Sequence, residues 1–167
     1  MVLRLNNGTD VVIRRVEPDD KELLAAAVRR LSPRTARLRF LAPKTHLTTA
    51  EQRYLTEIDF VDHYALIAVL DSDPSRLVGV GRWVRDAEDP RSAEIAFVVS
   101  DELQREGLGL ALGKALKLAA RARGIRRFTG VTLTENDGAL RLLGHLTTSL
   151  RKRVDGATYE VVADLAA

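Results

Sequence analysis

The chain has no cysteine among its 167 residues. Disulfide bonds, a catalytic thiolate and metal sites with sulfur ligands are therefore excluded, and the absence fits a reducing compartment. Long apolar runs are also absent, and the mixed, polar segment 1–10 does not resemble a signal peptide. These features predict a cytoplasmic protein with no membrane partner.

Aromatic residues are scarce, at 5% of the chain, and basic residues are scattered along it. The formal net charge is +3 and the pI is about 9.5, a mildly basic balance that suits anionic ligands. Surfaces that bind nucleic acids combine clustered basic residues with aromatic side chains. A nucleic-acid-binding module is therefore a disfavoured hypothesis, and we expect no nucleic-acid partner.

The length of the chain is typical of one domain, which can bury a core without a metal or a disulfide bond. The sequence contains no internal repeat, no low-complexity tract and no linker. We therefore predict a single domain over residues 1–167.

Apolar periodicity and turn residues predict the order of the elements. Strands are expected at 11–16, 64–70, 77–85, 93–99, 127–134, 151–154 and 157–163. Helices are expected at 20–31, with Asp19 or Asp20 as the cap, and at 33–40, 49–58, 108–123 and 137–146. The strand at 127–134 follows a long helix and should run parallel to the strand at 93–99. The predicted fold class is α/β (α+β), a mixed and mostly antiparallel twisted sheet with helices on both faces.

The segment 104–109, with the sequence Gln-Arg-Glu-Gly-Leu-Gly, lies between the strand at 93–99 and the long helix. Its two glycines allow a tight bend that brings several amide groups close to one anion. The free amides and the dipole of a helix start favour negative charge at the same place. We therefore predict a phosphate cradle, and the alternative is an ordinary strand-to-helix turn.

The strand, the pattern Gln104-x-x-Gly107-x-Gly109, the long helix, the next strand and Asn136 together resemble the GNAT superfamily of coenzyme A-dependent N-acetyltransferases. The resemblance covers nearly the whole chain. A closer similarity to the catalytic domain of actinobacterial protein-lysine acetyltransferases runs through five segments. They are Leu31-Ser32-Pro33-Arg34, Arg39-Phe40, Tyr54-Leu55-Thr56-Glu57, Asp62-His63-Tyr64-Ala65-Leu66 and Ala93-Glu94-Ile95-Ala96.

This resemblance implies acetyl-coenzyme A (acetyl-CoA) as the cosubstrate and no metal. Amides of the glycine loop would hold the pyrophosphate, and the strand before it would pair with the pantetheine arm. Asn136 would meet the cofactor as well, although an asparagine that starts a helix is also a common cap. Glu106 departs from the family, which usually carries Lys or Arg there, and it should point outward or weaken binding. The implied cofactor-binding residues are Phe97, Val98, Val99, Gln104, Arg105, Glu106, Gly107, Leu108, Gly109, Leu110 and Asn136.

Glu94 interrupts an apolar strand, where a carboxylate needs a partner or a function. Acetyl transfer to an amine needs a proton acceptor, because lysine amines are almost fully protonated at neutral pH. Partial burial raises the pKa of a carboxyl group toward the range of a useful general base. The family resemblance implies a catalytic glutamate at this place in the strand. The alternative is a salt bridge or exposure on an edge strand.

A general acid is harder to find. Many members of the superfamily carry a tyrosine as the general acid at the position where this chain has Leu143. Leucine cannot donate a proton, so the departing thiolate would take its proton from water. His46, His63 and His145 are far apart in the sequence, and a lone histidine is more often a packing or surface residue.

A protein lysine is the preferred acceptor, and a small-molecule amine is the second. Arg34, Arg37 and Arg39 would steer acidic surfaces toward the thioester if the helix at 33–40 borders it, or they form no more than a solvated face. A third hypothesis is a catalytically weak sensor that only binds coenzyme A, which Glu106 and Leu143 favour. The sequence leaves both a monomer and a homodimer open.

Overall fold

The computed structural model describes residues 1–165 and contains one eight-stranded sheet. The strands lie in the order β1-β2-β3-β4-β5-β6-β8-β7, and every neighbouring pair is antiparallel except β5 and β6. Their bounds are β1 Val2–Arg4, β2 Asp10–Arg15, β3 His63–Leu70, β4 Leu77–Arg85, β5 Ser92–Val99, β6 Arg127–Leu133, β7 Ser149–Asp155 and β8 Thr158–Asp164. The predicted mixed, mostly antiparallel sheet and its parallel pair are confirmed.

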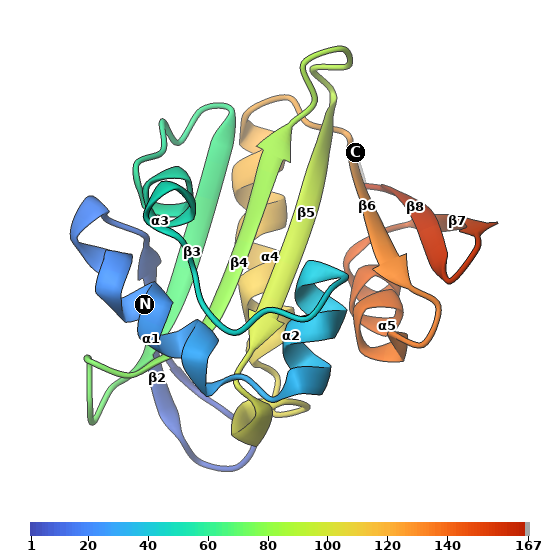
Figure 1. The fold of residues 1–167 in the computed structure, drawn as a ribbon. Coiled ribbons are helices and arrows are strands. Elements are labelled where there is room, and N and C mark those ends of the chain that lie inside the picture. The colour runs from blue at the N-terminus through green and yellow to red at the C-terminus, as the bar shows by residue number, and fades with distance from the viewer. Residues whose placement is uncertain (166–167) are drawn as a thin grey trace.

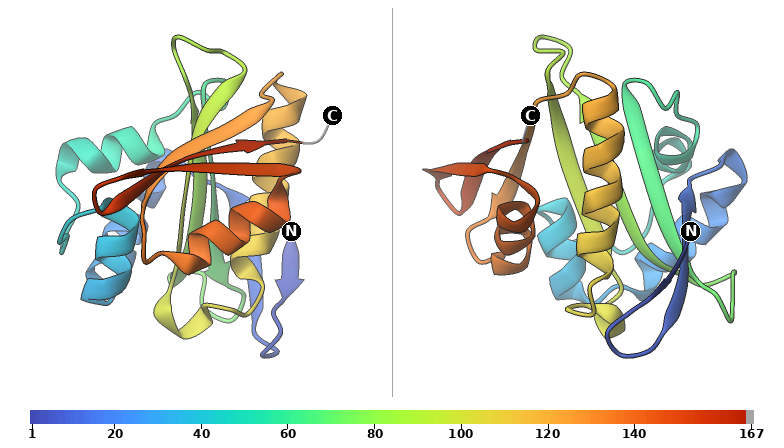
Figure 2. Two further views of the ribbon diagram at one scale, coloured as in Figure 1. Left: turned by 90° about the vertical axis from the view of Figure 1, so that its right-hand side faces the viewer. Right: turned by 180° about the vertical axis from the view of Figure 1, so that it is seen from behind.

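Helices cover both faces of the sheet, as predicted. The first three, α1, α2 and α3, lie on the face seen in Figure 1, and α4 crosses the opposite face, as the view from behind in Figure 2 shows. The bounds are α1 Lys21–Arg30, α2 Pro33–Phe40, α3 Thr49–Thr56, α4 Leu108–Ala122 and α5 Asp137–Leu146, with 3-10 turns η1 Pro18–Asp20 and η2 Asp101–Leu103. None of the helices in the described residues has the length and hydrophobicity to cross a membrane.

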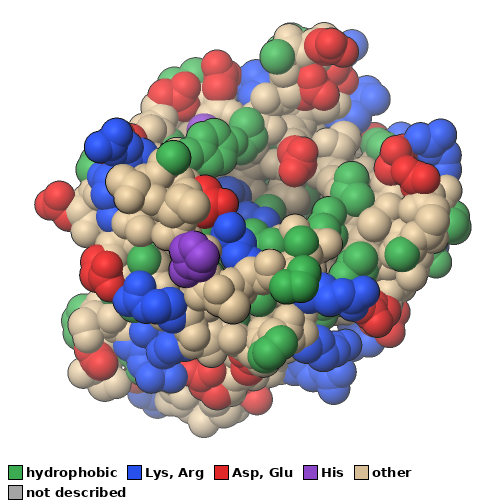
Figure 3. All heavy atoms as spheres, viewed as in Figure 1, with side chains coloured by type: hydrophobic (Ala, Val, Ile, Leu, Met, Phe, Trp, Pro, Cys, Tyr) green, Lys and Arg blue, Asp and Glu red, His purple; other side chains and the backbone are tan. Residues whose placement is uncertain are grey.

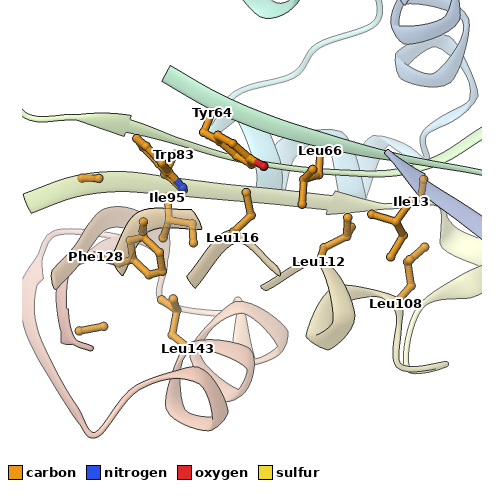
Figure 4. Packing of buried hydrophobic residues seen from close by; sticks show 14 of the residues in the cluster. Ile13, Tyr64, Leu66, Trp83, Ile95, Leu108, Leu112, Leu116, Phe128 and Leu143 are labelled. Atoms are coloured by element: carbon orange, nitrogen blue, oxygen red, sulfur yellow. The ribbon is translucent and has the colours of Figure 1, made fainter. Parts of the chain in front are cut away.

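The core has one part on each face of the sheet. Leu108, Leu112 and Leu116 recur at every fourth position of α4 and are fully buried against the sheet, with Leu116 near Ile95 and Leu108 near Ile13 (Figure 4). Burying a leucine side chain contributes about 1.5–3 kcal/mol, so this stripe fixes α4 firmly behind β4 and β5. The second part packs α1 on the other face, and its buried side chains include Leu24, Val28, Leu47, Ile67 and Val80.

Short capping signals position the helices on the front face. Ser32 Oγ accepts a hydrogen bond from the Thr35 amide at 3.2 Å, and Pro33 occupies the first turn of α2. Thr48 and Glu51 form a capping box at the start of α3, with reciprocal bonds of 2.8 and 3.2 Å. These two caps confirm the predicted starts of α2 and α3.

The start of α1 differs from the prediction. Asp20 precedes the helix but its carboxylate makes no cap bond to it. The carboxylate accepts from the Glu17 amide at 2.7 Å and from Arg14 at 2.7 and 2.8 Å, because the turn η1 comes between strand and helix. Asp20 therefore joins β2 to η1 and does not cap α1.

The sequence does not predict β1, whose three residues are too few to show a strand period. The strand predicted at 151–154 is shorter than β7 at both ends. The strand carries Arg151, Lys152 and Arg153 and lies at the edge of the sheet, so it lacks an apolar pattern that would mark its ends. Charged residues are common on edge strands, where they discourage pairing with another chain.

Candidate active site

The sheet opens between β5 and β6. The two strands pair only at their beginnings, through residues 92–94 of β5 and 127–129 of β6. Beyond that point β5 continues against β4 alone and β6 continues against β8 alone. Figure 1 shows the two strands diverging. Within the described chain, the edge of β5 from Ile95 to Val99 therefore has no strand partner on the β6 side.

The free edge of β5 leads to the glycine loop, residues 104–109. Arg105 and Gly107 have positive φ angles of 64° and 92°. Glycine adopts such an angle readily, whereas Arg105 is a strained residue of the kind that clusters at functional sites. A left-handed residue next to a right-handed one turns successive N–H groups toward one point and can form an anion-binding nest. Gly107, followed by the first helical residue Leu108, is such a pair.

The first turn of α4 adds to this nest. The helix begins at Leu108 with Gly107 as its cap residue, and in the described chain no side chain caps it. Its first backbone hydrogen bond runs from the Ala111 amide to the Gly107 carbonyl at 3.1 Å. The amides before Ala111 in the first turn therefore remain available for an anion.

The loop is held from both sides. Gln104 Nε2 donates to the Val99 carbonyl and to Thr35 Oγ1, both at 3.1 Å. On the other side the Asn6 amide donates to the Glu106 carbonyl at 3.1 Å. These bonds fix the loop between the end of β5, the helix α2 and the turn after β1, while the Glu106 side chain stays half-buried.

Asp101 strengthens the link between the loop and α2. Its carboxylate accepts from Ser32 Oγ at 2.7 Å, from the Ser32 amide at 3.0 Å and from Thr35 Oγ1 at 2.6 Å. Burial acts to raise the pKa of Asp101, but the bonds from Thr35 and Ser32 outweigh it and the pKa is lowered. Asp101 therefore stays ionised at neutral pH and holds α2 beside the loop.

Asn136 lies across the opening, at the end of β6, where it caps α5. Its side-chain oxygen accepts a hydrogen bond from the Ala139 amide at 3.1 Å. Asn136 therefore has the capping role that was the alternative to cofactor binding. Leu143 is only 5% exposed and packs in the core. Phe97, Val98 and Val99 lie along the free edge, on the near side of the opening.

A hollow of about 310 Å³ lies where β5 and β6 begin to separate, on the face covered by α2 and α3. Figure 3 shows this face recessed beside the sheet, with basic side chains inside the recess and an acidic one at its border. The residues that line it are Arg39, Tyr54, Leu55, Arg82, Val84, Arg85, Asp86, Glu94, Ala96 and Thr129.

Glu94 faces this hollow because strand residues alternate between the two faces. Its neighbours Ala93 and Ile95 point into the core behind the sheet, so Glu94 points forward, between Val84 of β4 and Thr129 of β6. The prediction that the Glu94 side chain is partly buried is wrong, because the residue is exposed. The salt-bridge alternative does not apply, because no ion pair or hydrogen bond reaches the carboxylate from residues 1–165. The exposure expected by the other alternative is observed, although β5 is an inner strand and not an edge strand.

Arg82 lines the hollow, and sequence reasoning missed it, whereas His63 is the packing residue behind it, a role that the sequence analysis left open. Arg82 is only 5% exposed, and its Nη1 contacts the Leu55 carbonyl at 3.2 Å and His63 Nε2 at 2.9 Å. Burial, and next the charge of Arg82, lowers the pKa of His63 from 6.5 to about 4. His63 is therefore neutral at physiological pH, and its Nε2 accepts from Arg82. A signal existed for Arg82, which is a charge inside an apolar strand just as Glu94 is.

The comparison with known proteins agrees with this geometry. Residues 26–146 match the model of the acetyltransferase (GNAT) family. The chain belongs to this family and is an acetyltransferase.

Two relatives and one solved structure are especially similar. Acetyltransferase Pat of Mycolicibacterium smegmatis is 28% identical over 144 residues, which are 86% of this chain and 43% of that protein. Acetyltransferase PA5475 of Pseudomonas aeruginosa is 31% identical over 133 residues, 79% of this chain and 71% of that one. The crystal structure of the GNAT domain of S. lividans PAT is 26% identical and aligns with a TM-score of 0.87 over 99% of this chain and 96% of that chain. This chain thus spans less than half of the Mycolicibacterium protein.

Proposed function

We propose that the chain transfers the acetyl group of acetyl-CoA to the side-chain amine of a protein lysine. The observation that carries the proposal is the opening between β5 and β6, which has a free strand edge, an uncapped helix start at one end and Glu94 at the other. Acetyltransferases of this family take their acetyl group from acetyl-CoA. The acceptor is inferred from the five segments that resemble the catalytic domain of actinobacterial protein-lysine acetyltransferases.

Acetyl-CoA would supply an activated thioester beside the free edge of β5. The main chain of Phe97, Val98 and Val99 would pair with the pantetheine arm, and the Val99 carbonyl can accept a second bond beside the one from Gln104. The pyrophosphate would bind the amides of Arg105 to Leu110, among which Leu108 contributes only its backbone because its side chain is in the core.

Glu94 would act as the general base. Its carboxylate is exposed at the hollow and has no competing cation within hydrogen-bond reach in the described chain, so an incoming ammonium group can contact it. The neutral amine would then attack the carbonyl carbon of the thioester, and the carbon–sulfur bond would break. An acceptor that fills the hollow would exclude water and make the base more effective than in the free chain.

The departing thiolate would take its proton from water. Leu143 is buried in the core, so no acid comes from that position. A thiol is a far stronger acid than an amine, so the thiolate leaves without a protein acid. Leu143, together with Glu106 in the loop, supports the second candidate function, a sensor that binds coenzyme A and has only weak acetyltransferase activity.

The test measures free thiol and acetylated lysine after incubation with acetyl-CoA and a set of lysine peptides. We expect thiol release that depends on the peptide, and one acetyl group on the lysine by mass spectrometry. Thiol release with polyamines or aminoglycosides but no peptide would support a small-molecule acceptor. A rise in melting temperature with acetyl-CoA, without thiol release from any amine, would support the sensor.

A further inference from the structure

The hollow contains two arginines without an acidic partner. Arg82 comes from β4, and only 5% of its surface is exposed. Arg39 comes from α2, is half-buried and lies 4.9 Å from the ring of Phe40. Neither arginine forms an ion pair within residues 1–165. Buried cations normally have such a partner, so the pair lacks an anion.

The other charged groups at the hollow do not provide that anion. Arg85 is neutralised by Asp62, with 2.7 Å between Nε and Oδ1. Asp86 accepts hydrogen bonds from the Glu88 and Asp89 amides and belongs to the turn after β4. Among the described residues, two cations of the hollow, Arg39 and Arg82, and two carboxylates, Asp86 and Glu94, therefore form no ion pair, and of these carboxylates only that of Glu94 accepts no hydrogen bond.

Glu94 and Arg82 are diagonal neighbours on one face of the sheet. Glu94 lies opposite Val84, and Arg82 lies opposite Ala96, two residues further along each strand. Diagonal neighbours have Cα atoms about 7–8 Å apart. The Arg82 guanidinium is held away from Glu94 by its bonds to the Leu55 carbonyl and His63. Glu94 forms no ion pair with Arg82 or Arg39 in the described chain, so the carboxylate and the two guanidinium groups can each contact a ligand that carries both charges.

Burial lowers the pKa of Arg82 and the nearby charge of Arg39 lowers it further, so the two cations repel each other. Arg39 is subject to the same burial effect, which the charge of Glu94 partly offsets. Both remain cations at neutral pH. A bound anion would relieve the repulsion and compensate for the lost hydration of both groups.

We propose that Arg39 and Arg82 form a subsite for a carboxylate carried by the acceptor, with the acceptor amine at Glu94. This inference rests on the proposed function and narrows its acceptor to an amine with a carboxylate close by. Two sources have that chemistry: a protein lysine with an acidic neighbour in its sequence, and a free amino acid. Arg34 and Arg37 are not part of the subsite, because Arg34 is exposed outside the hollow and Arg37 pairs with Glu135.

The experiment pairs a change in the protein with a change in the ligand. Binding of fluorescent lysine peptides with Glu or Gln beside the lysine is measured by anisotropy for the wild type, Arg39→Ala and Arg34→Ala. The wild type should bind the Glu peptide about tenfold more tightly, the scale of hydrogen bonds to a charged group. Arg39→Ala should reduce this preference to less than about twofold, and Arg34→Ala, from the same helix, should retain it. Competition by free lysine and free glutamate distinguishes the two sources of the ligand.

Turnover of the same peptides separates this inference from the proposed function. Equal binding of the Glu and Gln peptides by the wild type, with free amino acids failing to compete, would overturn the inference even if both peptides are acetylated. An equal loss of preference in Arg39→Ala and Arg34→Ala would also overturn it, because general surface charge would then explain the effect. A preference that depends on Arg39, without acetylation of any amine, would support the subsite and contradict the proposed function.

Discussion

His63 is a buried histidine that the fold keeps neutral. Its pKa falls from 6.5 in the unfolded chain to about 4 in the folded protein, through burial and then the charge of Arg82. Between these two values the unfolded chain binds a proton that the folded chain does not. The contribution of neutral His63 to the free energy of unfolding is therefore fully present above pH 6.5 and is lost as the pH falls toward 4.

We therefore predict that the melting temperature decreases between about pH 7 and about pH 5, and that His63→Gln makes the decrease smaller. Glutamine keeps a carbonyl oxygen for Arg82 but cannot be protonated in this range. Thermal denaturation at several pH values measures the effect, and His46→Gln, at an exposed histidine, should have the wild-type slope. An unchanged slope in His63→Gln would show that other groups cause the pH dependence.

At the scale of elements, the start of α4 connects the fold to the proposed ligand. Gly109 has room for a side chain, since an added Cβ would lie 3.5 Å from Leu142 and 3.9 Å from Val99. An acidic residue near a helix start is compatible with the helix itself but repels a phosphate. Gly109→Asp should therefore fold and lose the ligand, whereas Gly107, with φ of 92°, tolerates no such change without strain.

The corresponding prediction concerns the shift in melting temperature on addition of acetyl-CoA. Ligand at about a hundred times Kd stabilises a protein by about 2.7 kcal/mol, which is several degrees for a chain of this length. Gly109→Asp should abolish the shift, and Gly109→Asn should show how much of the loss comes from size alone. Gly144→Asp, at an open position of α5, should retain the wild-type shift. A full shift in Gly109→Asp would remove the glycine loop from the account.

The contact between α4 and α5 depends on Gly113. A Cβ added there would lie 2.3 Å from Leu146 Cδ1, and Leu146 is only 2% exposed. Gly113→Ala should destabilise the chain through overpacking of about 1–3 kcal/mol, less a gain in helix propensity of about 1 kcal/mol. At Gly144 an added Cβ would have no neighbour within 4 Å, so Gly144→Ala should show only the stabilising gain in helix propensity. Chemical denaturation of both variants measures the difference, and equal stabilities would mean that α5 moves freely away from α4.

At the scale of the whole molecule, local signals in the sequence predicted most of the elements. The stripe of Leu108, Leu112 and Leu116 predicts α4, and the Thr48–Glu51 box predicts the start of α3. The parallel pairing of β5 and β6 follows from the helix that connects them. Each of these predictions depends on residues that are close in the sequence.

The hollow could not be predicted in the same way. Arg82, His63 and Leu55 belong to three different elements, and their contacts depend on strand register and on the position of α3. The exposure of Glu94 follows from the divergence of β6 from β5 after residue 129, which strand periodicity does not report. The sequence therefore indicated Glu94 and, among three arginines, Arg39, but not the buried Arg82 that accompanies them.

The central claim is acetyl transfer with Glu94 as the base, and the most direct test is the initial rate of coenzyme A release with a lysine peptide, for wild type and Glu94→Gln. The account predicts a rate that rises with pH in the wild type and is about a hundredfold or more lower in the variant. It also predicts that the shift in melting temperature with acetyl-CoA is the same in both proteins, because Glu94 lies at the other end of the opening from the glycine loop. A variant that turns over at the wild-type rate at neutral pH would contradict the account.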